Sequence, residues 1–395
     1  RWKSMKQFKY IENNEQFGID YDFKRIRKKF KSLGIPSDVW TPEHMPTHCF
    51  WNAIMSERSL GKTTNCILWG MCMNWEYGTV IQYVRSKEEQ IMPKYSSKLF
   101  ETILKFGYVE KVTEGLWNTV VRKGREYYYA KENEDGQIEL IADKSFIHLL
   151  SVDQNMNYKS TYNAPLGDLI IFDEFIGKFY PLDEFVYFCD LIATIKRKRR
   201  NVHVFMLSNT IDRESEYFNE LEIYEDVQIL KKGENVVTAT SKGTKVYVEI
   251  AGNKEITKEK SFDLINFFGF KNPKLSAITG DDWATYQYPH IPSGEYKSLS
   301  HAMHLLNNGR LYELEIVEHE KIGVCIYVHR ANKLYDDSIV YTITDILDSR
   351  YRYGTGFTKM DMYIWKKLYN RHKFFYANNM CGSAVENYIN NVKYL

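Results

Sequence analysis

Residues 56–64 read Ser56-Glu57-Arg58-Ser59-Leu60-Gly61-Lys62-Thr63-Thr64, and this stretch decides the fold. It has the spacing of a phosphate-binding loop, with Ser56 in place of the usual first glycine. In such a loop, backbone N–H groups at the start of a helix surround the phosphates of a nucleoside triphosphate. Lys62 is then expected to reach the β- and γ-phosphates, and the Thr63 hydroxyl to ligate Mg²⁺. The stretch therefore predicts a triphosphate site with a divalent metal.

The sequence on either side of the loop agrees with this interpretation. Residues 48–55 form a short, largely apolar run that favours a buried strand, and residues 65–75 have the length of a helix. Strand, loop and helix in this order is the arrangement that the motif requires. The alternative is a chance Gly-Lys-Thr in a turn before a helix. Arg58 is unusual in such a loop, where it could stabilise charge at the γ-phosphate or pair with a nearby carboxylate.

A second motif is an apolar strand that ends in two acids. Residues 169–172 are apolar, and Asp173 and Glu174 follow directly. Such a run is typical of a buried central strand, and ligands in open α/β sheets bind outside the carboxyl ends of the strands. Asp173 is therefore predicted to meet the Mg²⁺ held by Thr63, and Glu174 to polarise the attacking water. The alternative is a strand that ends in a solvated acidic turn.

A third apolar strand, residues 202–207, ends in Ser208, Asn209 and Thr210. These side chains could sense the γ-phosphate through hydrogen bonds. They are also ordinary residues for a turn that follows a strand. The pattern alone leaves both interpretations open.

A basic run, residues 196–200, reads Lys-Arg-Lys-Arg-Arg and follows a segment of helical length, residues 182–195. Basic side chains suit the negative pole of a helix C-terminus, and charge runs usually face solvent. The run also resembles a nuclear localisation string or a nucleic-acid patch. A third interpretation is an arginine supplied to the nucleotide of a neighbouring subunit.

Composition narrows the class of protein. A chain of 395 residues favours two domains. The net charge of +2 gives no global signal of a nucleic-acid partner, so any such contact must come from local patches. The six cysteines include no Cys-x-x-Cys pair and are expected to be reduced, buried thiols of an intracellular protein. No apolar run of 18 residues and no apolar signal region are present, so neither secretion nor membrane spanning is predicted, and the start at Arg1 suggests a longer gene product.

Four segments are expected along the chain: an extension over residues 1–45, an ATPase domain over 46–252, a linker over 253–300 and a C-terminal domain over 301–395. In the extension, apolar residues at helical spacing between Asp20 and Gly34 predict an amphipathic helix on the core, with membrane or DNA contact as the alternative. In the C-terminal domain, three strands are expected to form a meander, near residues 311–317, 323–328 and 338–343. Helices are expected near residues 358–376 and 380–394.

Taken together, these motifs resemble the DNA-packaging ATPases of phi29-type tailed bacteriophages, which are relatives of large terminase subunits. The likeness covers residues 46–250 well and the C-terminal part only in its strand pattern. It rests on an arginine inside the phosphate loop, the basic helix end and four further strings: Tyr83-Val84-Arg85, Lys159-Ser160, Ile171-Phe172-Asp173-Glu174-Phe175-Ile176 and Leu207-Ser208-Asn209.

The resemblance implies an α/β P-loop NTPase of the additional-strand, catalytic-glutamate type. Such proteins form a ring, usually of five subunits, at the portal vertex of an empty capsid and hydrolyse ATP to drive double-stranded DNA inside. They act transiently at the procapsid in the host cytoplasm, and in phi29 relatives a structural RNA is an alternative docking partner to the portal protein.

The resemblance also assigns roles to residues. The triphosphate would lie against residues 56–64 and Asn209, the metal against Thr63 and Asp173, and the water against Glu174. Arg58 would act from within the subunit. Across the subunit interface the expected basic residues are Arg197, with Arg199 as the next candidate, and Lys159.

The family's C-terminal domain resembles an RNase H-like α+β nuclease that has lost its activity. A two-metal nuclease needs several carboxylates at strand ends, and the available acids form no convincing set: Glu313, Glu315, Asp336, Asp337 and Asp345. The alternative function is a large terminase with an active C-terminal endonuclease as well as the ATPase. A nucleotide-dependent switch without steady hydrolysis is a more distant option, because a switch does not require Glu174.

Overall fold

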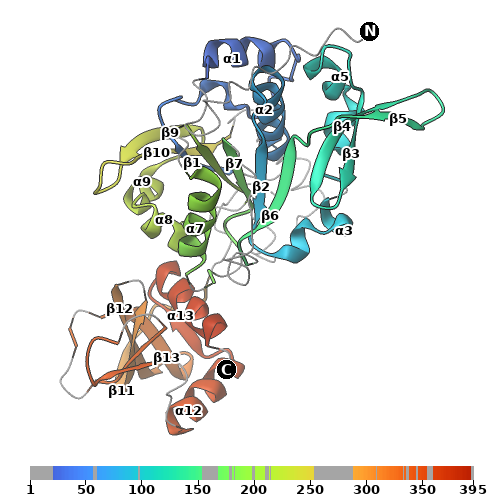
Figure 1. Ribbon diagram of the computed structural model, residues 1–395. Helices are drawn as coiled ribbons and strands as arrows, with labels where there is room; N and C mark the ends of the chain where they lie inside the picture. Colours follow the sequence, from blue (N-terminus) through green and yellow to red (C-terminus); the bar gives the residue numbers. More distant parts are fainter. Residues whose placement is uncertain are drawn as a thin grey trace.

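The computed structural model describes residues 21–56, 60–96, 98–153, 168–177, 180–181, 183–197, 201–209, 213, 215–252, 288–307, 309–331, 333–334, 338–343, 346–353 and 359–392. Within these residues the chain forms two bodies, each built on its own sheet (Figure 1). The larger sheet belongs to the part coloured blue to yellow, and the smaller one to the orange and red part.

The larger sheet has the order β3-β4-β6-β2-β7-β8-β1-β10-β9, with β5 paired to β4. Its six inner strands, from β6 to β10, all run parallel. The edges are antiparallel, where β4 pairs with β6 and β9 with β10. The bounds are β1 Trp51–Ser56, β2 Ile81–Arg85, β3 Thr119–Lys123, β4 Glu126–Glu132, β5 Ile138–Ile141, β6 Ile147–Ser151, β7 Leu169–Asp173, β8 His203–Ser208, β9 Glu234–Ala239 and β10 Lys245–Ala251.

Helices cover both faces of this sheet, which explains why a central strand such as β7 is apolar on both faces up to Asp173. On one face, Ile54 and Ile171 belong to a core with α1 (Phe23–Lys31), α2 (Lys62–Tyr77), α4 (Glu101–Lys105) and α5 (Tyr108–Val112). On the other face, Met55 and Phe172 belong to a core with α7 (Glu184–Lys196), α8 (Glu216–Glu220) and α9 (Tyr224–Ile229). Because successive side chains of a strand point to opposite faces, a strand between two helical layers is mostly apolar on both of its sides.

The strand order separates the two main sequence motifs. β1, which leads into the phosphate loop, pairs with β8 and β10, and β7, which ends in Asp173, pairs with β2 and β8. β8 therefore lies between the loop strand and the acidic strand. Since all three run parallel, their carboxyl ends meet at one edge of the sheet.

The N-terminal extension packs on this domain through its apolar side. Ile26 and Phe30 of α1 are buried, and the Phe30 ring lies 5.5 Å from the Trp69 ring of α2. Asp22 caps the helix by accepting hydrogen bonds from the backbone N–H groups of Lys24 and Arg25. The helical spacing between Asp20 and Gly34 thus marks a core-facing helix, followed by the short 3₁₀ helix η1 (Pro42–His44).

The smaller sheet differs from the predicted meander. Its order is β15-β14-β11-β12-β13-β16, in which β14 pairs in parallel with β11 and not with β13. The meander prediction was wrong because the first strand, β11, starts inside the segment expected to be a linker. The bounds are β11 Tyr296–Asn307, β12 Arg310–His319, β13 Gly323–Arg330, β14 Val340–Thr342, β15 Tyr351–Tyr353 and β16 Phe374–Tyr376.

Two helices follow these strands, α12 (Lys359–Asn370) and α13 (Asn379–Asn391). The expected helix over 358–376 ends early, because Phe374–Tyr376 pairs with β13 as a strand. α13 packs its buried side on the sheet through Val385 and Tyr388, in one core with Leu314 and Val328. Among the described residues, no helix combines the length and apolar character needed to cross a membrane.

Candidate functional site

The phosphate loop has the local geometry that its sequence predicts at both described ends. β1 ends at Ser56, and α2 begins at Lys62, with Gly61 as its N-cap at φ 76°. That left-handed conformation favours glycine. Glu57, Arg58 and Ser59 lie outside the described residues. The N-terminus of α2, with the first backbone N–H groups of Lys62, Thr63 and Thr64, is the part suited to an anion.

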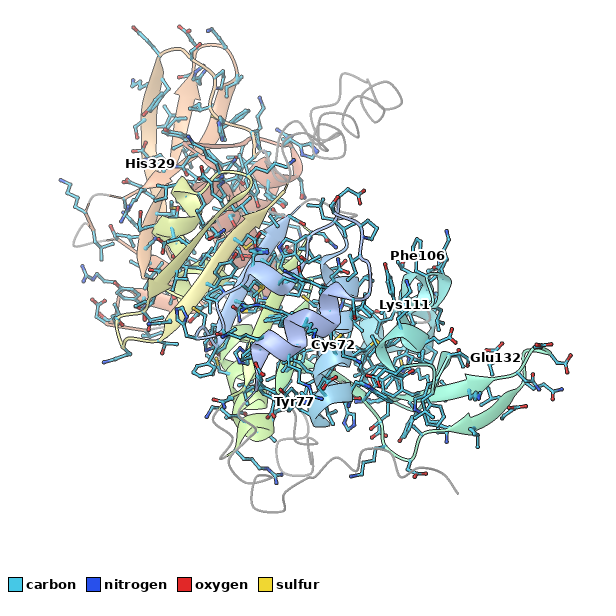
Figure 2. All side chains as sticks on the ribbon, turned by 90° about the horizontal axis from the view of Figure 1, so that it is seen from above. Cys72, Tyr77, Phe106, Lys111, Glu132 and His329 are labelled. Carbon is cyan, nitrogen blue, oxygen red and sulfur yellow. The ribbon has the colours of Figure 1, made fainter. Side chains whose placement is uncertain are left out.

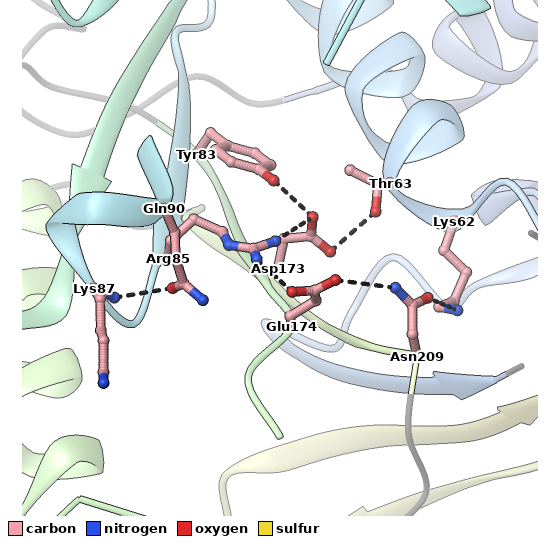
Figure 3. Close-up of polar contacts among 9 residues, drawn as sticks. All are labelled: Lys62, Thr63, Tyr83, Arg85, Lys87, Gln90, Asp173, Glu174 and Asn209. Carbon is pink, nitrogen blue, oxygen red and sulfur yellow. Dashed lines mark hydrogen bonds and ion pairs between the residues drawn. The ribbon is translucent and has the colours of Figure 1, made fainter. Parts of the chain in front are cut away.

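Asp173 is the centre of the site. Its Oδ1 accepts a hydrogen bond from Thr63 Oγ1 at 3.0 Å, which joins the acidic strand to the phosphate loop (Figure 3). Its Oδ2 accepts from Tyr83 OH at 2.6 Å and from Arg85 at 3.1 Å. Asp173 is 6% exposed, so these partners stabilise a carboxylate that is largely removed from water.

Glu174 is held by partners on both of its oxygens. Arg85 donates to Oε2, and Asn209 Nδ2 lies 3.4 Å from Oε1. Asn209 Oδ1 in turn accepts from Lys62 Nζ at 3.0 Å, so a continuous set of contacts runs from the loop lysine to Glu174 (Figure 3). Lys62 also donates to Ser56 Oγ, which gives the serine at the first loop position a direct role in holding the lysine.

Tyr83 and Arg85 are the site residues whose roles the sequence did not reveal. Both lie on β2, next to β7, where strand alternation points them toward Asp173. Burial lowers the pKa of Arg85, but the neighbouring Tyr83, Asp173 and Glu174 outweigh it and raise that pKa above its usual value. Burial, followed by the Asp173 charge, raises the pKa of Tyr83 well above its usual range. Arg85 is therefore a permanent cation that neutralises the two acids, and Tyr83 is a neutral donor.

The remaining predicted residues are placed less completely. Arg197 is the exposed C-cap of α7, with φ 45° and its backbone N–H bonded to Ala193 O. Lys159 and Arg199 lie outside the described residues. The structure thus brings together Ser56, Lys62, Thr63, Asp173, Glu174 and Asn209, while the three basic residues expected to act across an interface remain predictions.

The donor set fits a magnesium ion. Thr63 Oγ1, in the first turn of α2, and Asp173 Oδ1, at the end of β7, lie 3.0 Å apart. Mg²⁺ usually takes one or two protein oxygens and completes its shell with water and phosphate. A hydroxyl and a carboxylate beside a phosphate-binding helix end match that preference.

The described acids of the smaller body are arranged differently from those at Asp173. Within the described residues, Glu313, Glu315 and His329 place ligand atoms within 4.8 Å of one another. His329 lies on β13 in the smaller body, apart from Cys72 and Tyr77 of α2 (Figure 2). Its Nε2 is 3.5 Å from Glu315 Oε2, so an ion pair is one reason for the cluster. The other acids considered lie outside the described residues: Asp336, Asp337 and Asp345.

Comparison with solved structures identifies proteins of similar fold. The chain matches the Phi-28 gp11 DNA packaging motor with a TM-score of 0.56 and 16% identity, over 91% of this chain and 99% of that one. The chain has the fold of a phage DNA-packaging motor protein. The bacteriophage Phi-29 viral genome packaging motor assembly matches with a TM-score of 0.53 and 17% identity, over 90% of this chain and 100% of that one.

The packaging-motor fold therefore extends over both bodies of the molecule, including the C-terminal part that the sequence motifs did not reach. No protein-family model matches the sequence, and no curated protein matches it. The similarity is therefore one of structure. At this level of sequence identity, few residues outside short motifs are expected to be the same.

Proposed function

We propose that this protein is an ATPase that drives double-stranded DNA into a preformed viral capsid. The observation that carries the proposal is the contact between Thr63 and Asp173 at 3.0 Å, with Glu174 next in the chain. It lies at the carboxyl edge of the larger sheet, in a chain whose fold is similar to that of solved DNA-packaging motors. β8 between the loop strand and the acidic strand supports an NTPase of the additional-strand, catalytic-glutamate type.

The residues divide the work of hydrolysis between them. The N-terminus of α2 and Lys62 would bind the phosphates of ATP, and Thr63 and Asp173 would hold Mg²⁺, which neutralises developing charge on the phosphate oxygens when bound. Glu174 would orient the attacking water and accept its proton. Because Asn209 contacts both Lys62 and Glu174, it is placed to link the state of the γ-phosphate to the position of the base.

The assembly is part of the proposal. We expect a homo-oligomeric ring of five subunits at the portal vertex, in which Arg197, then Arg199 and Lys159, reach the nucleotide of the neighbour, with Arg58 acting from within the subunit. The exposed position of Arg197 at the end of α7 supports a role outside its own subunit. The portal protein or a structural RNA would be the docking partner.

For the C-terminal domain we propose a vestigial RNase H-like fold. Its antiparallel β11, β12 and β13, with β14 and β15 added in parallel beside β11, support that assignment. The competing function, an active endonuclease, draws its support from the cluster of Glu313, Glu315 and His329. Two carboxylates on one strand differ from the several at strand ends that two-metal cleavage needs.

Purified protein tests the proposal directly. ATP turnover is measured with and without duplex DNA for the natural chain and for Lys62→Ala, and capsid-dependent protection of DNA from nuclease reports packaging. We expect DNA-stimulated turnover that Lys62→Ala abolishes, together with protection that requires ATP. Unchanged turnover in Lys62→Ala would remove the phosphate loop from the proposal, and turnover without protection would limit the function to ATP hydrolysis.

A further inference from the structure

The segment Val39–His44 crosses the end of the phosphate loop. The Trp40 backbone N–H donates to Leu60 O at 2.9 Å, and Asn65 Nδ2 of α2 donates to Trp40 O at 2.5 Å. A Cβ built on Gly61 would lie 3.4 Å from Val39 Cβ. The backbone of one residue in the N-terminal extension is thus bonded both to the last part of the loop and to the first turns of the helix that follows it.

A buried carboxylate holds this segment from the other side. Glu249 on β10 is 6% exposed. Its Oε2 accepts from Trp40 Nε1 and Tyr247 OH, both at 3.0 Å, and lies 3.0 Å from His44 Nε2. Its hydrogen bond, followed by its charge, raises the pKa of His44 against the effect of burial. A carboxylate with so many polar neighbours in a dry environment is a rigid anchor.

The anchor and the loop are tied to the same pair of strands. Glu249 is in register with Ile54 of β1, two residues before Ser56. The extension is fixed independently by Arg27 of α1, which donates to Glu43 O and Met45 O, both at 2.9 Å. The loop therefore starts on a strand next to Glu249 and ends under a segment bonded to Glu249.

We propose that Trp40, held by Glu249, is a positioning residue that fixes the phosphate loop for the triphosphate of ATP. This inference rests on the proposed ATPase function and extends the nucleotide site into the N-terminal extension. A loop whose backbone N–H groups must point at phosphates binds better when its end is fixed beforehand, because less conformational entropy is lost on binding. The Trp40–Glu249 contact is the same before and during the chemical step. We therefore expect it to change the affinity for the nucleotide and not the rate of hydrolysis.

Trp40→Phe tests this because it keeps an aromatic ring and removes the indole N–H together with part of the ring volume, and a matched Trp→Phe control corrects for the lost volume. One net hydrogen bond corresponds to about a fivefold change in an equilibrium constant. We expect the Kd for a fluorescent ATP analogue and the KM for ATP to rise about fivefold, with kcat unchanged within about twofold. Hydrogen exchange of the amides of residues 60–65 should become faster.

Trp117→Phe is the matched control, because Trp117 is 7% exposed and Trp40 8% exposed in the same core. It should lower the melting temperature to a similar extent without changing nucleotide affinity or exchange in residues 60–65. Glu249→Gln keeps an acceptor oxygen, so its affinity for the ATP analogue should lie between that of the natural chain and that of Glu249→Leu. In the Glu249→Leu background, Trp40→Phe should add little, since both remove the same contact.

Two failures can be told apart. If the natural chain does not bind the ATP analogue, the proposed ATPase function fails. If it binds, and Trp40→Phe changes neither affinity nor exchange in residues 60–65, the positioning role of Trp40 is wrong. Equal effects of Trp40→Phe and Trp117→Phe on affinity would overturn it as well, because they would reflect a general loss of stability.

Discussion

The two sheets of this molecule place their polar side chains differently. In the larger sheet, the polar residues beside the phosphate loop lie at strand ends: Ser56 ends β1, Asp173 ends β7, and Ser208 ends β8 just before Asn209. In the smaller sheet, Glu313, Glu315 and His329 lie within β12 and β13, on the side opposite the apolar core. Parallel strands bring all their carboxyl ends to one edge, whereas antiparallel strands send successive ends to opposite edges. The parallel inner strands of the larger sheet can therefore collect strand-end groups around one phosphate, whereas the antiparallel β12 and β13 cannot.

The largest effect is expected from replacing Glu174, the proposed general base of the strand-end site. Glu174→Gln keeps the size of the side chain and removes its ability to accept a proton from water. We expect kcat for ATP to fall about a thousandfold, within the range for loss of a general base, while the Kd for ATP changes little. Single-turnover hydrolysis with a nucleotide titration measures both. Full turnover would show that another group activates the water.

The next prediction tests whether one chain contains the whole catalytic site or needs Arg197 of a neighbouring subunit. Arg197→Ala should lower turnover in assembled rings by at least about a hundredfold if its guanidinium stabilises charge on a neighbour's nucleotide. Mixing Arg197→Ala with Lys62→Ala subunits should restore part of the turnover, at interfaces that pair an intact pocket with an intact arginine. Absence of any restoration in mixed rings would argue that Arg197 acts elsewhere.

A smaller effect, on the stability of the protein, is expected from replacing Arg85 at the same edge of the sheet. Arg85→Met removes the cation that bonds to Asp173 and Glu174. Asp173 then stays largely buried, and Tyr83 is the donor that remains at its Oδ2. Losing one partner of such a pair costs about 3 kcal/mol of the free energy of unfolding. Denaturant unfolding measures this, and Arg122→Met serves as a comparison, because Arg122 on β3 is half-buried but donates to the uncharged Ser96 Oγ and Ile91 O. Equal losses in both variants would contradict the central place given to Arg85.

A pH-dependent effect is expected where the two bodies meet. Glu216 on α8 accepts from Asn307 at 2.9 Å, and Arg310 contacts Asn219 at 3.1 Å and the Tyr224 ring at 4.3 Å. Burial raises the pKa of Glu216 to about 7. The unfolded chain loses this proton at lower pH than the folded chain, so stability falls as pH rises from about 4.5 to about 7, by up to about 3 kcal/mol.

Glu216→Gln isolates that contribution. Unfolding free energies at pH 5 and pH 8 should differ less in the variant than in the natural chain, because the amide does not ionise. Glu220→Gln on the same helix, where the carboxyl is more exposed, provides the comparison. Identical pH dependence with and without Glu216 would show that the contact with Asn307 is made equally well by the ionised form.

The smallest effect is expected in the smaller sheet. Glu313→Gln combined with Glu315→Gln should leave ATP turnover within about twofold of the natural value, and neither protein should nick supercoiled DNA with Mg²⁺ or Mn²⁺. Cleavage by the natural chain that the double variant loses would favour the endonuclease alternative and place a second functional site in the smaller sheet.

Much of the larger sheet's edge was predictable, because a phosphate loop and an apolar strand ending in two acids each carry their function in consecutive residues. The roles of Tyr83 and Arg85 were not, since nothing in the string Tyr83-Val84-Arg85 says which carboxylates lie on the neighbouring strand. The meander prediction failed for a related reason: the pairing of β14 with β11 depends on a strand more than 30 residues earlier in the chain.

The sequence by itself predicted a triphosphate as the ligand class, and it determined the helix start at Lys62 and the acids at the end of β7, because backbone conformation and side-chain chemistry there are set within a few residues. Tertiary structure alone decided that β8 separates those two motifs, that Arg85 bridges both acids and that Trp40, bonded to Glu249, lies beside the end of the loop. Those arrangements join residues far apart in the chain, and only the pairing of strands and the packing of the extension bring them within hydrogen-bonding distance.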